Sequence, residues 1–343
     1  MKIAVIGAGV AGLTAGRILA EAGHEIVVFE KSRGYGGRLA TRYAGENNST
    51  KVDHGLPYIE VSSEKIEPLV NELIESGILK PCVGPFIHKN AEGEESQVKP
   101  TKKRYIAPKG MNQVGKKLAR MVDVRTESKV SGITHIGEDR TKKRSWMLNF
   151  PTGAAENFDA VIIATPSKQA YAILNTTIDE VATLKLLRDV DSVEYDPTFS
   201  LMVGYGSAEI PEWAMMSCEN DVIDSITNEA SKREDGAECS FVIHTTPEFA
   251  KKFMNSDREE VEEIILDELS EIIGGWSALP EWKELHFWRY SKVKNPLDCP
   301  FMEVVGHDAP IALVGSYMNG DSVESAYLSG LAIGEFWSDK FSD

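Results

Sequence analysis

Cysteine is scarce in this sequence. The four cysteines among 343 residues stand far apart, at Cys82, Cys218, Cys239 and Cys299. Because no two of them form a CxxC pair, a thiol redox motif of that type and a zinc ribbon are both disfavoured. Sparse cysteine is typical of a reducing compartment, so we expect a cytoplasmic protein.

Positive charge is also in deficit. Lys and Arg total 37 against 53 Asp and Glu, which gives a formal net charge of −16. Nucleic acids and anionic membranes both attract basic surfaces, so the composition argues against either as a partner. The histidines outside the motifs below show no spacing with other ligands, and we therefore expect no metal site. These histidines are His24, His88, His135, His244 and His307.

Long apolar runs are absent as well. No stretch approaches the ~20 apolar residues that span a bilayer. The apolar segment after Met1 has the composition of a signal peptide, but its ordered glycines favour a buried strand followed by the start of a helix. We therefore expect the N-terminal segment to be part of the fold.

The chain length predicts about two domains. Segments typical of nucleotide-binding strands lie at both ends of the chain, and the middle differs from them. We predict a discontinuous cofactor domain of residues 1–60, 105–166 and 305–343. A substrate domain of residues 61–104 and 167–304 would be inserted in it.

Hydrophobic patterns predict the regular elements. Expected strands are 2–6, 25–30, 146–150, 160–164, 199–203, 241–244, 285–290 and 311–314, with a further strand within 122–136. Expected helices are 12–22, 63–76, 109–121, 258–273 and 323–337. We expect residues 33–58 to be irregular, 82–104 to form a hairpin or loop, and 139–144 to form a charged turn.

A glycine motif occupies the first expected turn. Residues 7–12 read GAGVAG, follow a strand, open a helix, and are followed by Glu30 at the end of the next strand. This context is the dinucleotide-binding fingerprint. Gly7 permits the tight turn, Gly9 admits the pyrophosphate to the backbone, and Gly12 allows close packing. The helix N-terminus attracts phosphate, and Glu30 can accept both hydroxyls of the adenosine ribose.

FAD and NAD share this fingerprint, so further motifs must separate them. A glycine pair and an arginine follow at Gly36-Gly37-Arg38, and an expected strand ends in Ala164-Thr165-Pro166. With the fingerprint, these motifs resemble the flavin-containing amine oxidase superfamily. Four stretches are similar to its renalase-like members: 36–42 (GGRLATR), 53–58 (DHGLPY), 286–290 (HFWRY) and 323–330 (VESAYLSG).

The resemblance implies an α/β fold. A glutathione-reductase-like Rossmann domain with a central parallel sheet would bind FAD without a covalent link, and an inserted α+β domain of mixed sheet and helices would bind substrate. The implied cofactor-binding residues are Gly7, Gly9, Val10, Ala11, Gly12, Glu30, Lys31, Gly36, Gly37, Arg38, Thr41, Val130, Ala164, Thr165, Ser316, Glu324, Ser325 and Ala326. Val130 would contact the adenine through its backbone. The helix that starts at Val323 would face the flavin pyrimidine, where its dipole favours negative charge.

Two positions depart from the pattern of the family. Ser316 stands where many relatives carry Asp beside the ribityl chain, so a hydrogen bond there would lack charge assistance. Asp321-Ser322 stands where renalase-like proteins tend to have Gly-Arg. If that arginine normally meets substrate, the substrate of this chain differs from theirs.

The chain shows one dinucleotide fingerprint and no redox cysteine pair, so the electron donor should bind directly over the flavin. The resemblance implies hydride transfer from 2- or 6-dihydro-NAD(P) isomers to flavin N5, with O2 reoxidising the flavin to give H2O2. Such a donor needs no base, only a flat aromatic slot with hydrogen-bond donors. The candidate catalytic residues are His54, Tyr58, Trp288, Arg289 and Tyr290, each of which suits simple packing or a surface position nearly as well.

Two alternatives remain open at this point. One is an amine oxidase, or a desaturase of another small reduced compound, because of the superfamily fold and the departures at Ser316 and Asp321-Ser322. The other is a flavin-binding protein without turnover. The expected partners are therefore a small-molecule substrate, most specifically a dihydronicotinamide nucleotide, and O2, with no nucleic acid, membrane or metal.

Overall fold

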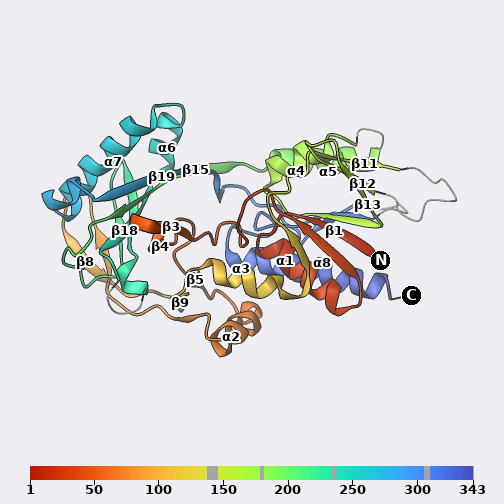
Figure 1. Ribbon diagram of the computed structural model, residues 1–343, viewed down its shortest axis with the longest axis horizontal. Helices are drawn as coiled ribbons and strands as arrows, with labels where there is room; N and C mark the ends of the chain where they lie inside the picture. The colour runs from red at the N-terminus through yellow and green to blue at the C-terminus, as the bar shows by residue number, and fades with distance from the viewer. Residues whose placement is uncertain (137–145, 178–180, 234–236, 305–309, 343) are drawn as a thin grey trace. The chain divides into compact units, whose positions relative to one another are not determined.

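The computed structural model describes residues 1–136, 146–177, 181–233, 237–304 and 310–342, with the backbone alone for 181–185. The chain divides into two compact units, each described by itself below (Figure 1). Unit 1 contains Met1–Gly37, Val114–Tyr195 and Val293–Asp343, and unit 2 contains Arg38–Gln113 and Asp196–Lys292. Within the described ranges, no helix has the length and apolar composition that a membrane crossing requires.

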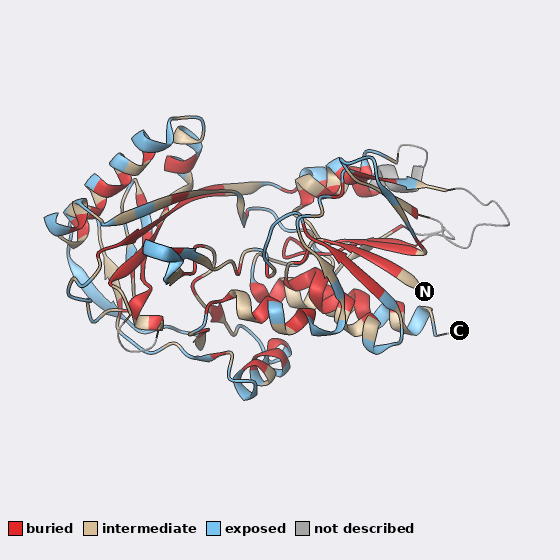
Figure 2. Cartoon of the chain, in the orientation of Figure 1, coloured by how far each residue is buried: buried red, intermediate tan, exposed pale blue. Residues whose placement is uncertain are grey.

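A six-stranded sheet forms the centre of unit 1. Its order is β10-β2-β1-β14-β21-β20, and every neighbouring pair is parallel except β21 with β20. The central strands are almost wholly buried (Figure 2), which explains why they are continuous apolar runs. The bounds are β1 Lys2–Ile6, β2 Glu25–Phe29, β10 Asp123–Arg125, β14 Ala160–Ile163, β20 Met302–Glu303 and β21 Ile311–Leu313.

Two long helices of unit 1 pack closely against each other. These are α1, Val10–Glu21, and α8, Val323–Lys340. A Cβ on Gly330 of α8 would collide with the carbonyl oxygen of Ala11, and one on Gly334 would lie 2.9 Å from Cβ of Ile18. The helices can approach this closely only because α8 has glycine at both positions.

Unit 1 also holds a three-stranded antiparallel sheet, β11-β12-β13. Its side chains and those of α4 join the parallel sheet in one hydrophobic core, which includes Trp146, Phe158 and Leu174. The sequence patterns missed β13, α4 and α5. The bounds are β11 Gly132–His135, β12 Trp146–Asn149, β13 Ala155–Phe158, α4 Ser167–Leu174 and α5 Val181–Ser192; α3 covers Asn112–Leu118.

Unit 2 is built on a seven-stranded mixed sheet of order β19-β15-β18-β17-β16-β7-β8. Helix α7, Arg258–Ile273, has the predicted bounds, and its buried Val261, Ile265 and Leu269 pack in the core of this unit. The remaining bounds are β7 Phe86–Lys89, β8 Glu95–Val98, β15 Tyr195–Gly204, β16 Met215–Cys218, β17 Ile223–Asn228, β18 Ser240–Thr245, β19 Trp282–Val293 and α6 Pro247–Phe253.

Shorter elements complete unit 2. The region 33–58, expected to be irregular, contains a hairpin of β3, Arg42–Ala44, and β4, Thr50–Val52. This expectation was wrong because Ala44 and Val52 are buried against Met202 and Val242 of the large sheet, a contact that the local pattern does not show. A small sheet has the order β5-β9-β6, with bounds Ile59–Glu60, Arg104–Ile106 and Lys80–Pro81, and α2 covers Glu67–Glu75.

The boundaries of the two units differ from those of the predicted domains. Residues 38–60 and 105–113 lie in unit 2, and residues 167–195 and 293–304 lie in unit 1. The hairpin packs with the large sheet of unit 2, and α4 shares the hydrophobic core of the parallel sheet of unit 1. These contacts place both segments in other units than the predicted domains did. The predicted charged turn at 139–144 lies outside the described residues.

Candidate functional site

The glycine turn of unit 1 uses its three glycines in two different ways. Gly7 has φ +111°, and a Cβ there would lie 2.8 Å from the carbonyl oxygen of Ala164. A Cβ on Gly12 would collide with the carbonyl oxygen of Gly7. A Cβ on Gly9, by contrast, would have no described atom within 4 Å. The fold itself therefore requires glycine at Gly7 and Gly12, whereas the space beside Gly9 is open to a ligand.

Helix α1 begins at this open space. Its N-cap is Gly9, and no side chain among the described residues caps the helix. Its first turn, Val10-Ala11-Gly12, carries no acidic residue. An uncapped helix N-terminus presents free N–H groups and partial positive charge, which suits a phosphate group. The turn therefore fits the pyrophosphate of a dinucleotide.

Glu30 lies at the end of β2 with its carboxylate held in place. Oε2 accepts the amide of Ala8 at 3.0 Å, and Oε1 accepts the amide of Ser32 at 2.8 Å and its hydroxyl at 2.7 Å. A carboxylate oxygen can accept two hydrogen bonds, so Oε2 retains capacity for one more. The dinucleotide fingerprint predicts that an acidic residue at this position accepts a ribose hydroxyl, and Oε2 has the capacity to do so.

The second glycine pair lies alongside the first turn. The amide of Gly36 donates to the carbonyl oxygen of Ala8 at 2.8 Å, and Gly37 has φ +59°. A Cβ on Gly37 would lie 3.3 Å from Cα of Gly9, and one on Gly115 would lie 2.7 Å from Cα of Gly36. Two backbone segments without side chains therefore run together at the predicted pyrophosphate position.

The other predicted cofactor residues of unit 1 differ in burial and in their distance along the chain from the glycine turn. Ala164 donates its amide to Ile6 at 2.8 Å, which places it and Thr165 beside the glycine turn. Val130 is buried, and the amide of nearby Ser128 donates to the carbonyl oxygen of Glu30. Lys31 is exposed, and its Nζ donates to Gln169 at 3.3 Å.

At the start of α8, the predicted cofactor residues have roles within the helix itself. Ser322 and Ser325 form a reciprocal capping box, in which the amide of Ser325 donates to Oγ of Ser322 at 3.0 Å. That amide is therefore already paired, and Glu324 adds a buried carboxylate to the same first turn. Ser316, like Glu324, is buried, and Ala326 is half-buried.

An aromatic cluster of His54, His286 and Trp288 forms in unit 2. The rings of His54 and Trp288 stack with centroids 5.3 Å apart, and His286 meets each of them edge-on at 5.0 and 4.5 Å. Trp288 donates its Nε1 hydrogen to the carbonyl oxygen of His54 at 2.9 Å. His54 and Trp288 were predicted site residues and His286 was not. His286 alternates with Trp288 and Tyr290 on β19, so strand periodicity places it on their face.

Both imidazoles of the aromatic cluster are held neutral. Burial lowers the pKa of His54 to about 3, followed by repulsion from His286 when that ring is also protonated and by the positive charge of Arg42. Burial, followed by Arg42 and Arg258, lowers the pKa of His286 to about 4. Among the described residues, Nδ1 of His54 is buried and has no hydrogen-bond partner. The cluster therefore presents flat, uncharged rings at neutral pH.

The structure does not bring all five predicted catalytic residues together. Arg289 lies on the opposite face of β19, exposed, with its guanidinium over the ring of Phe287 at 5.7 Å. Tyr58 packs under the guanidinium of Arg104 at 4.4 Å and lines a pocket with Cys82 and other side chains. Strand alternation therefore separates Arg289 from Trp288 and Tyr290, which lie on the other face of β19.

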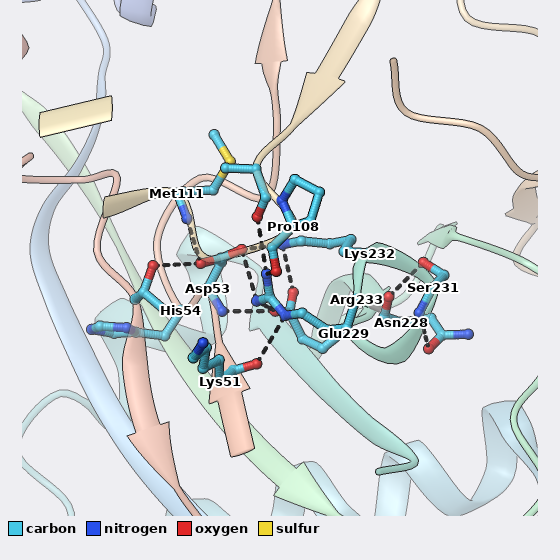
Figure 3. Close-up of polar contacts among 12 residues, drawn as sticks. Lys51, Asp53, His54, Pro108, Met111, Asn228, Glu229, Ser231, Lys232 and Arg233 are labelled. Carbon is cyan, nitrogen blue, oxygen red and sulfur yellow. Dashed lines mark hydrogen bonds and ion pairs between the residues drawn. The ribbon is translucent and has the colours of Figure 1, made fainter. Parts of the chain in front are cut away.

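A charge cluster that the sequence analysis missed lies next to His54 (Figure 3). It consists of Asp53, Glu229, Lys232 and Arg233, all of them buried or nearly so. Nζ of Lys232 lies 2.7 Å from a carboxylate oxygen of both Asp53 and Glu229. Nη2 of Arg233 lies 2.9 Å from Asp53 and 2.5 Å from Glu229. Two anions and two cations thus balance to zero net charge.

The cations dominate the electrostatics of Asp53. Burial alone would raise the pKa of this carboxyl group, but Lys232 and Arg233 outweigh it and hold the pKa at about 2. Only Asp53 belongs to a motif that the sequence analysis recognised. Its partners Lys232 and Arg233 come ~180 residues later with no periodic signal, so no local pattern could have paired them.

Two predicted cofactor residues, Arg38 and Thr41, lie in unit 2 and already have partners there. Thr41 donates its hydroxyl to Oδ1 of Asp53 at 2.6 Å and accepts the amide of Asn112 at 3.1 Å. Arg38 donates from Nη1 to the carbonyl oxygen of Ser291. Any role that they have toward a cofactor is therefore added to a structural one.

The fold and the glycine turn define a dinucleotide-binding α/β protein, and comparison with known families makes this specific. Residues 5–73 match the NAD(P)-binding Rossmann-like domain. Residues 84–333 match the family of flavin containing amine oxidoreductases. The chain belongs to the flavin-containing amine oxidoreductase family. It is an FAD-dependent oxidoreductase, with FAD held non-covalently as is typical of the family.

Individual relatives agree with this assignment. Renalase of Mus musculus is 24% identical over 326 residues, which cover 92% of each chain. The flavin-dependent L-tryptophan oxidase RebO of Lentzea aerocolonigenes is 45% identical over 65 residues, or 19% of this chain and 12% of the relative. The expected renalase-like membership of the superfamily is thereby confirmed.

Solved structures show the same fold. Cyclohexylamine oxidase from Brevibacterium oxydans has a TM-score of 0.71 at 11% identity, covering 100% of this chain and 99% of that one. Putrescine oxidase bound to putrescine has a TM-score of 0.70 at 13% identity, with 99% coverage of both. The fold is therefore that of flavin amine oxidases, with a Rossmann domain and mixed sheets.

Proposed function

We propose that the protein is an oxidase that takes a hydride from 2- or 6-dihydro-NAD(P) isomers onto flavin N5 and passes the electrons to O2. With one proton taken up from solvent, the products are NAD(P)⁺ and H2O2. The similarity to renalase along 92% of the chain supports this assignment. The observation that carries it is the aromatic cluster, whose flat and neutral rings suit a planar donor that already holds a transferable hydride.

Unit 1 is the proposed FAD-binding domain, of the glutathione-reductase-like type. The backbone at Gly9 and the N-terminus of α1 would hold the diphosphate, and Glu30 would accept a hydroxyl of the adenosine ribose. Val130 would contact the adenine through its backbone, and Ser316 would bond the ribityl chain. Bound FAD supplies the two-electron acceptor that O2 reoxidises.

Unit 2 is the proposed substrate domain. Its aromatic cluster would stack with the dihydronicotinamide ring, and Tyr290 on the same face of β19 would extend that surface. Loss of a hydride from the dihydronicotinamide leaves an aromatic cation and releases no proton. The neutral imidazoles of His54 and His286 therefore need only orient the ring and exclude water; neither has to act as a base.

Anaerobic mixing of the FAD-loaded protein with each donor tests the proposal. We expect 2- or 6-dihydro-NAD(P) to bleach the visible absorbance of the flavin within the mixing time, and O2 to restore it with one H2O2 per donor. Ordinary 4-dihydro-NAD(P) is the matched control and should react much more slowly. If a primary amine bleaches the flavin rapidly and none of the dihydro isomers does, the assignment is wrong.

The second candidate is an amine oxidase, or a desaturase of another small reduced compound. The specific observations in its favour are the departure from the pattern of many relatives at Ser316 and from the renalase-like pattern at Asp321-Ser322. Bleaching by amines in the same experiment would identify it, and a flavin that no donor reduces would indicate a protein without turnover. The cytoplasmic location stays a prediction.

A further inference from the structure

The charge cluster ties together four segments of unit 2 that are distant in the sequence. Arg233 donates to the carbonyl oxygens of Lys51 at 3.2 Å and Ala107 at 3.1 Å. Asp53 accepts the amide of Met111 at 2.9 Å and the hydroxyl of Thr41 at 2.6 Å. The segments around residues 41, 51–53, 107–111 and 229–233 therefore share one buried set of bonds. Figure 3 shows the last three of these segments together.

His54 is fixed on both sides, by the charge cluster on one and by three strands of the large sheet on the other. On its N-terminal side, the amide of Asp53 donates to Oε2 of Glu229 at 2.8 Å. On its C-terminal side, the carbonyl oxygen of His54 accepts Ser200 Oγ at 2.9 Å, His244 Nε2 at 3.2 Å and Trp288 Nε1 at 2.9 Å. Three strands, β15, β18 and β19, thus hold one carbonyl group, and the charge cluster holds the residue before it.

Stability alone is a poor explanation for four buried charges. Desolvating an ion pair costs about as much as the attraction returns, and apolar replacements of similar volume are often no less stable. A network of this kind does restrict the geometry of the chain, because each member has partners in fixed directions. Because Asp53 directly precedes His54, the charge cluster restricts the backbone next to the aromatic cluster.

We propose that Asp53, Glu229, Lys232 and Arg233 are positioning residues that set the place of His54 and, through its carbonyl oxygen, the orientation of Trp288 in the aromatic cluster. The inference rests on the proposed function only in taking that cluster as the substrate-binding surface. The charge cluster itself needs no contact with substrate or flavin.

The test uses the FAD-loaded full chain and a double variant, Glu229→Gln with Lys232→Met. It removes one charge of each sign and leaves the pair of Asp53 and Arg233. The matched control, Glu262→Gln with Lys283→Met, makes the same two changes at a more exposed ion pair of unit 2, whose Nζ–Oε2 distance is 3.2 Å. The readout is the indole N–H resonance of Trp288, assigned by Trp288→Phe.

We expect the Trp288 resonance to shift or broaden in the charge-cluster variant and to stay in place in the control. With a donor that reduces the flavin, kcat/KM should fall on the order of tenfold to a hundredfold in the first variant alone, since small misplacements of a binding group have effects of that size. An unchanged resonance and unchanged kcat/KM per bound flavin, with only a lower melting temperature, would overturn the proposal.

A milder variant covers the case in which the double variant does not fold. Arg233→Lys keeps the charge but loses the planar fork that reaches the carbonyl oxygens of Lys51 and Ala107. It should move the same resonance in the same direction, and a resonance identical to wild type would count against the proposal. The resonance is read without any donor, so failure of the dihydronicotinamide assignment leaves this result intact.

Discussion

Replacing Gly9 with valine should abolish FAD binding while the protein still folds. Gly9 has φ −79° and ψ 176°, an extended conformation that any residue adopts, and its Cβ position has no described atom within 4 Å. The cost to the apoprotein is limited to the poorer N-cap, about 1 kcal/mol. In the holoprotein, the branched side chain would fill the space proposed for the pyrophosphate.

The loss of FAD binding can be measured as a loss of stabilisation, because a ligand that binds only the folded protein raises its free energy of unfolding. FAD at 100 times its dissociation constant should stabilise the wild-type protein by about 2.7 kcal/mol, and the Gly9→Val variant should gain nothing. Denaturant unfolding with and without FAD gives both values, and flavin fluorescence gives the bound fraction. Gly12→Val is the contrasting control: its Cβ collides with the carbonyl oxygen of Gly7, so it should destabilise the apoprotein by at least ~1–3 kcal/mol.

Two outcomes would refute this reasoning. A yellow, fully loaded Gly9→Val protein would mean that the space beside Gly9 is not where the pyrophosphate binds. Equal destabilisation of the apoprotein by Gly9→Val and Gly12→Val would mean that Gly9 is required by the fold. In either case, the division of the glycines into structural and ligand-binding positions would be wrong.

Three further predictions follow from the site. Glu30→Gln should weaken FAD binding about tenfold in a fluorescence titration, because the amide of glutamine accepts hydrogen bonds at only one of its two terminal atoms. An unchanged affinity would remove Glu30 from the ribose site. Because His54 and His286 have folded-state pKa values of about 3 and about 4, below that of an unfolded histidine, stability should be fully present above about pH 6.5 and fall as the pH drops toward those values. A thermal midpoint independent of pH between 4 and 6.5 (roughly the affected window) would contradict this. Arg289→Ala should leave kcat/KM within about twofold of wild type, whereas Trp288→Ala should lower it tenfold or more at full FAD occupancy; a large effect of Arg289→Ala would place that residue in the site after all.

The sequence was most informative where function depends on neighbouring residues. The turn from Gly7 to Gly12, with Glu30 at the end of the next strand, is local, and the structure forms the predicted strand, helix and strand at those positions. Helix α7 was predicted with its observed bounds because its apolar positions repeat at the helical period. Both signals lie within ~30 residues of chain.

Predictions were weaker where a segment derives its structure from distant partners. The hairpin of β3 and β4 was expected to be irregular, since its two short strands are stabilised by burial against Met202 and Val242. Arg289 was grouped with Trp288 because the two are adjacent in a motif. In a strand, adjacent side chains point to opposite faces, so adjacency in the motif was the wrong guide.

The amino-acid sequence by itself predicted the dinucleotide-binding turn, because the backbone geometry of that turn is local. The resemblance of its short motifs to a known superfamily implied the superfamily and the flavin. The tertiary structure alone decided that His54 meets His286 and Trp288, and that Asp53 is neutralised by Lys232 and Arg233. The physical reason is that ion pairing and ring stacking depend on distance in space. Residues separated by ~180 positions leave no periodic trace of such contacts in the chain.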